Sequence, residues 1–213
     1  MHSTQILLGQ VAAFIAILQA IPYIWSILMG HTRPSRVSYG IWAVILTIEL
    51  ASYIAVGATT TVWVLLVLTI NAFIIFGLSI KYGMGGRTKF DIPCLVVAGI
   101  AIVLWLTTKN PALAVYFSTL AGFIGYLPTI KKAYLLPNTE NTLSWVMYVI
   151  AATLNVCALT SLSFVIALPP ICGFVLSVVV ASLLLFPRWK FMKVPREYYA
   201  APFLSSFQYK SED

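Results

Sequence analysis

Glu49 is the one charged residue deep inside an apolar run of this sequence, which makes it the first candidate for chemistry. It lies eleven residues after Ser38, about 16 Å away at 1.5 Å per residue along a helix. An unpaired carboxylate at that depth in lipid is costly, and no lysine or arginine inside an apolar run is available to pair with it. We therefore expect a carboxyl group that couples proton movement or contacts a substrate. The structural alternative is a protonated carboxyl bonded to a neighbouring helix.

Helical spacing gives Glu49 aromatic and polar neighbours. Trp42 and Tyr53 fall on the same stripe as Glu49, seven residues before it and four residues after it. The corresponding stripe of a later apolar run holds Tyr148 and Asn155. We predict that these four side chains bind a substrate near the middle of a membrane.

Two more polar residues and two prolines lie inside apolar runs. Asn71 and Ser177 are predicted to bind the same substrate, although a lone asparagine within a membrane also often joins two helices. Pro22 and Pro128 each remove a backbone hydrogen bond and bend a helix. We expect both prolines to act as hinges; the alternative is a static kink that helps packing.

The elements that position these residues follow from composition. Hydrophobic residues make up 61% of the 213 residues and charged residues only 9%, whereas soluble domains carry roughly 25% charged residues. A membrane span needs about 20 mostly apolar residues. Seven runs qualify: 5–29, 38–57, 61–80, 92–107, 112–135, 143–162 and 166–187. The predicted fold is an all-α integral membrane protein with seven transmembrane helices.

The basic residues predict the orientation of these helices. A net charge of +7 would suggest a nucleic-acid partner in a soluble protein, but here membrane topology accounts for it. Of the 13 lysines and arginines, all except Lys109 fall on one side of the seven runs, which the positive-inside rule assigns to the cytoplasm. We expect a plasma or inner membrane, with the N-terminus outside, the C-terminus in the cytoplasm and no nucleic-acid partner.

Tryptophans near the ends of the runs are expected to anchor the protein at the membrane surfaces. Those near the inner boundary are Trp25, Trp145 and Trp189, and those near the outer boundary are Trp63 and Trp105.

The chain contains an internal repeat with an offset of 106 residues. This offset relates Pro22 to Pro128, Ser38 to Ser144, and Glu49 to Asn155, and it superposes the first three runs on the last three. A fourth helix between two triplets makes the triplets parallel, an arrangement found in transporters. We therefore predict a first triple-helix repeat over 1–81, a linker with the fourth helix over 82–110, a second repeat over 111–187 and a cytoplasmic tail over 188–213.

With this repeat, the sequence resembles the PQ-loop superfamily, which includes the SWEET sugar transporters, lysosomal cystine and cationic amino-acid exporters, and the KDEL receptor. The resemblance implies two parallel triplets joined by a linker helix (3+1+3), and it places Asn71 at a substrate-binding position. Tyr23 and Thr129 stand where the name-giving glutamine would be, and the second and sixth runs lack the SWEET prolines. The residues that carry the resemblance are 18–22, 38–42, 68–71, 122–128 and 144–145.

These observations predict a transporter for a small polar solute such as a sugar, an amino acid or a vitamin-like molecule. It would work by alternating access through a midplane site, with Glu49 coupling the movement to protons. The alternative is a receptor or sorting protein on the same scaffold that transports nothing. The sequence shows no nucleophile pair, paired carboxylates or metal cluster, so we expect no enzyme activity, metal or cofactor. Whether copies associate into oligomers stays open.

Overall fold

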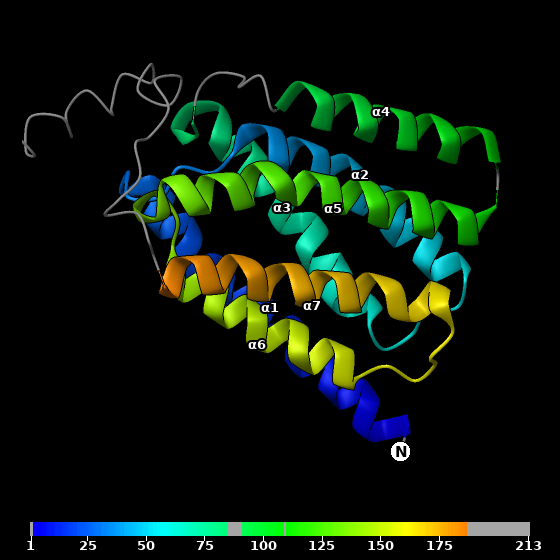
Figure 1. Cartoon of the computed structure of the whole chain (residues 1–213). Helices are drawn as coiled ribbons and strands as arrows, with labels where there is room; N and C mark the ends of the chain where they lie inside the picture. Colours follow the sequence, from blue (N-terminus) through cyan, green and yellow to red (C-terminus); the bar gives the residue numbers. More distant parts are fainter. Residues whose placement is uncertain (1, 85–90, 109, 187–213) are drawn as a thin grey trace, which may run out of the picture.

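The described part of the chain folds into seven long α-helices that run roughly along one direction (Figure 1). The computed structural model describes residues 2–84, 91–108 and 110–186, and within these ranges it contains no strand. Each predicted apolar run corresponds to one helix, so the all-α prediction is confirmed. The helices are α1 (His2–Leu28), α2 (Arg36–Ala55), α3 (Val62–Tyr82), α4 (Asp91–Thr108), α5 (Pro111–Leu135), α6 (Thr142–Cys157) and α7 (Phe164–Leu185), with a 3-10 turn, η1 (Pro137–Thr139), before α6.

Five of the described helices, α1, α2, α3, α5 and α7, are long and apolar enough to cross a membrane. Large apolar side chains face outward from them, such as Phe14, Ile21 and Phe73, each more than half exposed. Polar side chains such as Glu49 and Asn71 are buried instead. This inside-out distribution is what a lipid environment favours, and it indicates an integral membrane protein.

The starts of α2 and α6 are capped in the same way, 106 residues apart. The side chain of Ser35 accepts a hydrogen bond from the backbone N–H of Ser38, and the side chain of Asn141 accepts one from the N–H of Ser144. Such caps satisfy an N–H that lacks a partner in the first helical turn. The offset found in the sequence therefore relates two helix starts as well as two serines.

The end of α6 differs from the prediction. The apolar run extends to residue 162, but the helix ends at Cys157. Side chains from α1 and from the α2–α3 link bond to the carbonyl groups that follow the helix end: Gln5 donates to the Leu159 oxygen and Thr60 to the Ala158 oxygen. These bonds replace the helical hydrogen bonds, so apolar composition alone overestimates the length of α6.

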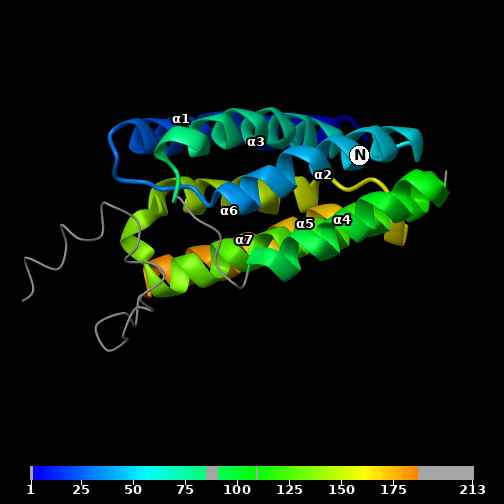
Figure 2. The same ribbon diagram turned by 90° about the horizontal axis from the view of Figure 1, so that it is seen from above.

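The helices form three groups across the bundle (Figure 2). α1 and α3 lie on one side, α5 and α7 lie on the other, and α2 and α6 lie between them. α2 packs against α3 and α5, whereas α6 packs against α1 and α7. α4 lies outside, along α5.

One end of the bundle gathers the α1–α2 link, the α5–α6 link and the last residues of α3 and α7 (Figure 1). The basic and aromatic tail predicted over 188–213, with Trp189, lies outside the described residues, as does the side chain of Trp105. Trp25 and Trp63 are 63% and 45% exposed, which agrees with anchors at a membrane surface.

Candidate solute-binding cavity

A cavity of about 140 Å³ lies between the helices. Residues of α1, α2, α3, α5, α6 and α7 line it, whereas none of the described side chains of α4 does. Six of the residues predicted as substrate-binding or proton-coupling groups reach this one cavity, although they come from three helices. They are Trp42, Glu49 and Tyr53 of α2, Asn71 of α3, and Tyr148 and Asn155 of α6.

Glu49 is buried, with 4% of its surface exposed, and it lies on the cavity wall. The hydroxyl of Thr119, on α5, donates a hydrogen bond of 2.7 Å to Glu49 Oε1. Thr119 is the one described residue that bonds to this carboxyl group, and the pairing crosses between α2 and α5. The carboxyl group is therefore held in position while keeping room for a proton or a ligand.

Asn155 occupies the position related to Glu49 by the 106-residue offset, and it is 7% exposed. Its side-chain oxygen Oδ1 has no hydrogen-bond partner among the described residues. A buried acceptor without a partner costs about 1–3 kcal/mol. Because Asn155 lines the cavity, a molecule inside it that donates a hydrogen bond would remove this cost.

Asn71 and Ser177, which the offset also relates, differ in their surroundings. Asn71 lines the cavity, and its amide Nδ2 donates a hydrogen bond of 3.3 Å to the carbonyl oxygen of Ala16 on α1. It therefore joins two helices as well as bordering the cavity. Ser177 is fully buried and donates to the Phe174 oxygen in its own helix. It does not line the cavity.

Aromatic rings form a continuous row along the cavity wall. Neighbouring centroids in the row lie 4.6–6.3 Å apart, which is the range of favourable aromatic contacts. The indole N–H of Trp42 also donates to the Gly122 oxygen at 3.2 Å, which joins α2 to α5. In order of contact, the six rings are Tyr23, Tyr39, Trp42, Tyr126, Trp145 and Tyr148.

The prediction that Trp145 anchors the protein at a membrane surface is wrong. Trp145 is 5% exposed, borders the cavity and donates its indole N–H to Glu140 Oε2 at 3.0 Å. A position near the end of an apolar run does not reveal the direction in which the side chain points. Trp145 points inward, where Glu140 accepts its only donor.

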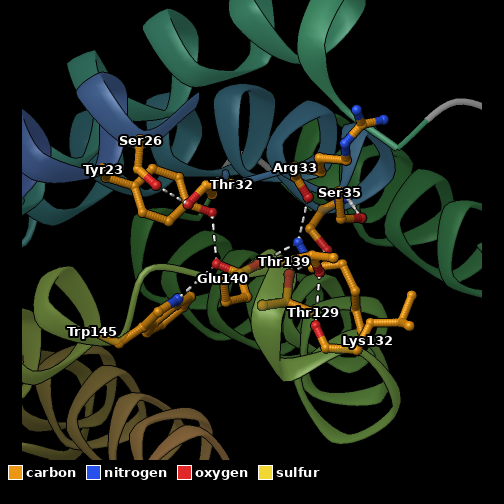
Figure 3. Close-up of polar contacts among 12 residues, drawn as sticks. Tyr23, Ser26, Thr32, Arg33, Ser35, Thr129, Lys132, Thr139, Glu140 and Trp145 are labelled. Carbon is orange, nitrogen blue, oxygen red and sulfur yellow. Dashed lines mark hydrogen bonds and ion pairs between the residues drawn. The ribbon is translucent and has the colours of Figure 1, made fainter. Parts of the chain in front are cut away.

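At the end of the bundle where α5 meets α6, a buried ion pair joins Lys132 to Glu140 (Figure 3). Lys132 is 2% exposed and Glu140 is 7% exposed. Lys132 also donates to the carbonyl oxygen of Arg33, in the α1–α2 link, and Tyr23 of α1 donates to Glu140 Oε2 at 2.9 Å. Together with Trp145, these residues form what we call the Lys132–Glu140 cluster.

This cluster connects segments that are far apart in the sequence. Tyr23 and Arg33 belong to the first predicted repeat, whereas Lys132, Glu140 and Trp145 belong to the second. The sequence places Lys132 among the basic residues at the membrane surface and predicts no role for Glu140. One signal was present, because Glu140 is an acidic residue in the short connection that follows Lys131 and Lys132.

A hydroxyl contact joins the two predicted repeats near the other end of α2. The Tyr53 hydroxyl donates to the Ile166 oxygen of α7 at 2.6 Å and is hydrogen-bonded to the Thr61 hydroxyl at 2.8 Å. Tyr53 lies fifteen residues after Ser38, or about 22 Å along the helix. Ser38 accepts a hydrogen bond from Thr129, and Thr129 lies close to the Lys132–Glu140 cluster (Figure 3). The cavity therefore lies between two sets of contacts that join the repeats.

The predicted hinges lie inside helices, Pro22 in α1 and Pro128 in α5. Each immediately precedes a residue that bonds across the bundle: Tyr23 bonds to Glu140, and Thr129 donates to Ser38 at 2.9 Å. The amide of Asn141 also donates to the Pro22 oxygen at 3.4 Å. Both prolines are thus placed where a bend would alter the contacts at this end of the cavity.

Comparison of the chain with models of protein families, with curated proteins and with solved structures finds no match in any of the three. The geometry of the cavity and of the two sets of contacts is therefore the basis for a functional proposal.

Proposed function

We propose that the protein is a membrane transporter of the PQ-loop type, which moves a small polar solute by alternating access through the cavity. One observation carries the proposal: Glu49 and Asn155, buried at positions related by the repeat, line the same cavity. Buried polar groups between membrane helices mark substrate and ion pathways because their burial is otherwise unfavourable. An asymmetric pair, one carboxyl and one amide, suits an asymmetric solute.

The pattern of helix packing supports two parallel triplets joined by α4. The contacts can be compared by replacing α1, α2 and α3 with α5, α6 and α7. The contact between α1 and α3 then corresponds to the contact between α5 and α7. In the same way, the contact between α2 and α3 corresponds to that between α6 and α7, and the contact between α2 and α5 to that between α6 and α1. All six pairs are in contact. This exchange symmetry is expected for a two-fold axis between the repeats, with α4 serving only to restore direction.

The proposed orientation places the Lys132–Glu140 cluster on the cytoplasmic side and Tyr53 toward the outside. It rests on the described basic residues at the end of the bundle that contains the α1–α2 and α5–α6 links, namely Arg33, Arg36, Lys81, Lys131 and Lys132. Access from one side would then require the opening of the contacts at one end while those at the other end hold. Pro22 and Pro128, next to residues of the cytoplasmic contacts, would act as hinges for that opening.

The first test identifies a solute and then asks whether it crosses a membrane. Purified protein is screened by thermal shift against small polar metabolites, and a stabilising compound is then supplied as tracer to sealed vesicles that contain the protein. We expect protein-dependent uptake that varies with pH and is strongly reduced by Glu49→Gln, because the amide cannot exchange a proton. Thr153→Ala, on an exposed face of α6, serves as the control.

Two outcomes would contradict this proposal. A compound that stabilises the protein but never enters the vesicles would indicate a receptor instead of a transporter. Uptake by Glu49→Gln at the wild-type rate and with the wild-type pH dependence would remove Glu49 from the mechanism.

A further inference from the structure

Among the described residues that line the cavity, the ionisable charge is negative and no positive charge opposes it. Glu49 is the single acidic residue among the described residues of the lining, which include no lysine, arginine or histidine. Asn155 adds a buried acceptor oxygen that lacks a partner in the described chain. A ligand that carries a carboxylate or phosphate would find no positive charge there, whereas a ligand with N–H donors would find two acceptors.

The aromatic wall favours the same kind of ligand. Tyrosine and tryptophan rings attract a cation over their faces, most strongly where water is excluded. Trp42 and Tyr126 lie only 4.6 Å apart between centroids and border the cavity together with Trp145. The volume of about 140 Å³ limits the ligand to a small molecule, because an apolar cavity of about 150 Å³ holds one benzene.

We propose that the cavity binds a small organic cation that has a compact apolar body, N–H donors and no carboxylate. Its N–H groups donate to the Glu49 carboxylate and to Asn155 Oδ1, and its body lies against the aromatic row. This proposal names the class of solute for the transporter proposed above and rests on that function for movement across the membrane. The binding step itself can be tested without transport.

The Glu49 carboxyl group can hold either a proton or the cation, because either one balances the negative charge of the carboxylate. A neutral carboxyl group that takes up the cation becomes a carboxylate and releases one proton to the solvent, so charge in the cavity is conserved. Among the described residues, the titratable groups on which the charge of Glu49 acts are the phenols of Tyr53, Tyr126 and Tyr148 and the thiol of Cys172. These groups are neutral in their ordinary state at neutral pH, so Glu49 alone exchanges the proton. Movement of the cation one way would accompany movement of a proton the other way.

The proposal can be tested by measuring the binding of three probes to the purified full chain in detergent. Each probe contains one phenyl ring. They are phenethylammonium (a cation), 2-phenylethanol (neutral) and phenylacetate (an anion), titrated by calorimetry between pH 5 and pH 8. We expect phenethylammonium to bind and to gain affinity with rising pH, by up to about tenfold per pH unit. Buffers of different ionisation enthalpy should reveal about one proton released per cation. Phenylethanol should bind at least about tenfold more weakly, and phenylacetate should not bind.

Four variants separate the charge of Glu49 from the shape of the cavity. Glu49→Gln should lower the affinity for phenethylammonium at least about tenfold and abolish its pH dependence, whereas Glu49→Asp should keep the pH dependence. Asn155→Ala should weaken binding severalfold. Thr153→Ala should leave it unchanged, because that hydroxyl is exposed and donates to the Val149 oxygen of its own helix. Circular dichroism checks that each variant is folded.

Any of three results would overturn the cation site: no binding of phenethylammonium, equal or tighter binding of either other probe, or wild-type binding by Glu49→Gln. Failure of transport gives a different result. If the cation binds as expected but no cation crosses sealed vesicles, the site stands and the transport function falls. If a neutral solute is transported and phenethylammonium does not compete with it, transport stands and the cation site falls.

Discussion

At the scale of single residues, the buried Lys132–Glu140 pair should be costly to disturb. Both side chains are buried, and removal of one partner leaves an uncompensated charge, which costs about 3–5 kcal/mol. We expect Lys132→Met and Glu140→Gln each to lower the free energy of unfolding in detergent micelles by about this amount. The double variant should lose less than the sum of the two, because neither charge remains. Additive losses would show that the pair does not interact energetically.

Tyr53 offers a second test at the opposite end of the cavity. Tyr53→Phe keeps the buried ring but removes the hydroxyl that donates to Ile166 and is bonded to Thr61. We expect the variant to unfold at a lower temperature, with a loss of about 1–3 kcal/mol from the acceptors left unpaired. Tyr134→Phe is the matched control, since Tyr134 is 45% exposed. If both variants unfold at the same temperature as the wild type, the Tyr53 hydroxyl does not join the repeats.

Helical periodicity predicted which residues meet at the cavity better than it predicted what they contact. It placed Trp42, Glu49 and Tyr53 on one face of α2, and all three line the cavity. It could not find Thr119, whose contact with Glu49 depends on how α5 packs against α2. Ser177 failed as a lining residue for a related reason, because equal depth in a repeat does not guarantee that the side chain points inward.

At the scale of elements, Gly125 determines how closely α5 approaches α2. A Cβ atom at this position would lie 2.8 Å from Trp42 Nε1, so Gly125→Ala must displace the indole or separate the helices. A Cβ atom added at Gly77, in α3, would have no neighbouring atom within 4 Å. We expect Gly125→Ala to lower the free energy of unfolding. Gly77→Ala should raise it by about 0.5–1 kcal/mol, because alanine favours a helix more than glycine does. Equal effects of the two substitutions would contradict a close contact at Gly125.

Apolar runs predicted the number and order of the helices because burial of about 20 apolar residues in lipid is a property of the sequence alone. They did not predict the end of α6, which depends on side chains of Gln5 and Thr60 that arrive from other parts of the chain. The matching caps at Ser35 and Asn141 lay within reach of the sequence, since both are favoured cap residues at the offset of the repeat.

At the scale of the whole molecule, the two sets of contacts that join the repeats should compete. If the Lys132–Glu140 cluster holds one end of the cavity and Tyr53 the other, weakening one set shifts the population toward the state open at that end. Cys172 lines the cavity and can report on access. In a Cys94→Ser, Cys157→Ser background, its reaction with a membrane-impermeant methanethiosulfonate can be followed from either side of oriented vesicles.

We expect Glu140→Gln to speed the modification of Cys172 from the side of the α1–α2 and α5–α6 links and to slow it from the other side. Tyr53→Phe should have the opposite effect, because it weakens the contacts with Thr61 and Ile166. The ratio of the two rates measures the population shift, so a change of tenfold corresponds to about 1.4 kcal/mol between the states. Opposite shifts in the two variants are the signature of alternating access. A rate that rises from both sides in either variant would instead indicate a loosened bundle, and unchanged rates would show that these contacts do not control entry to the cavity.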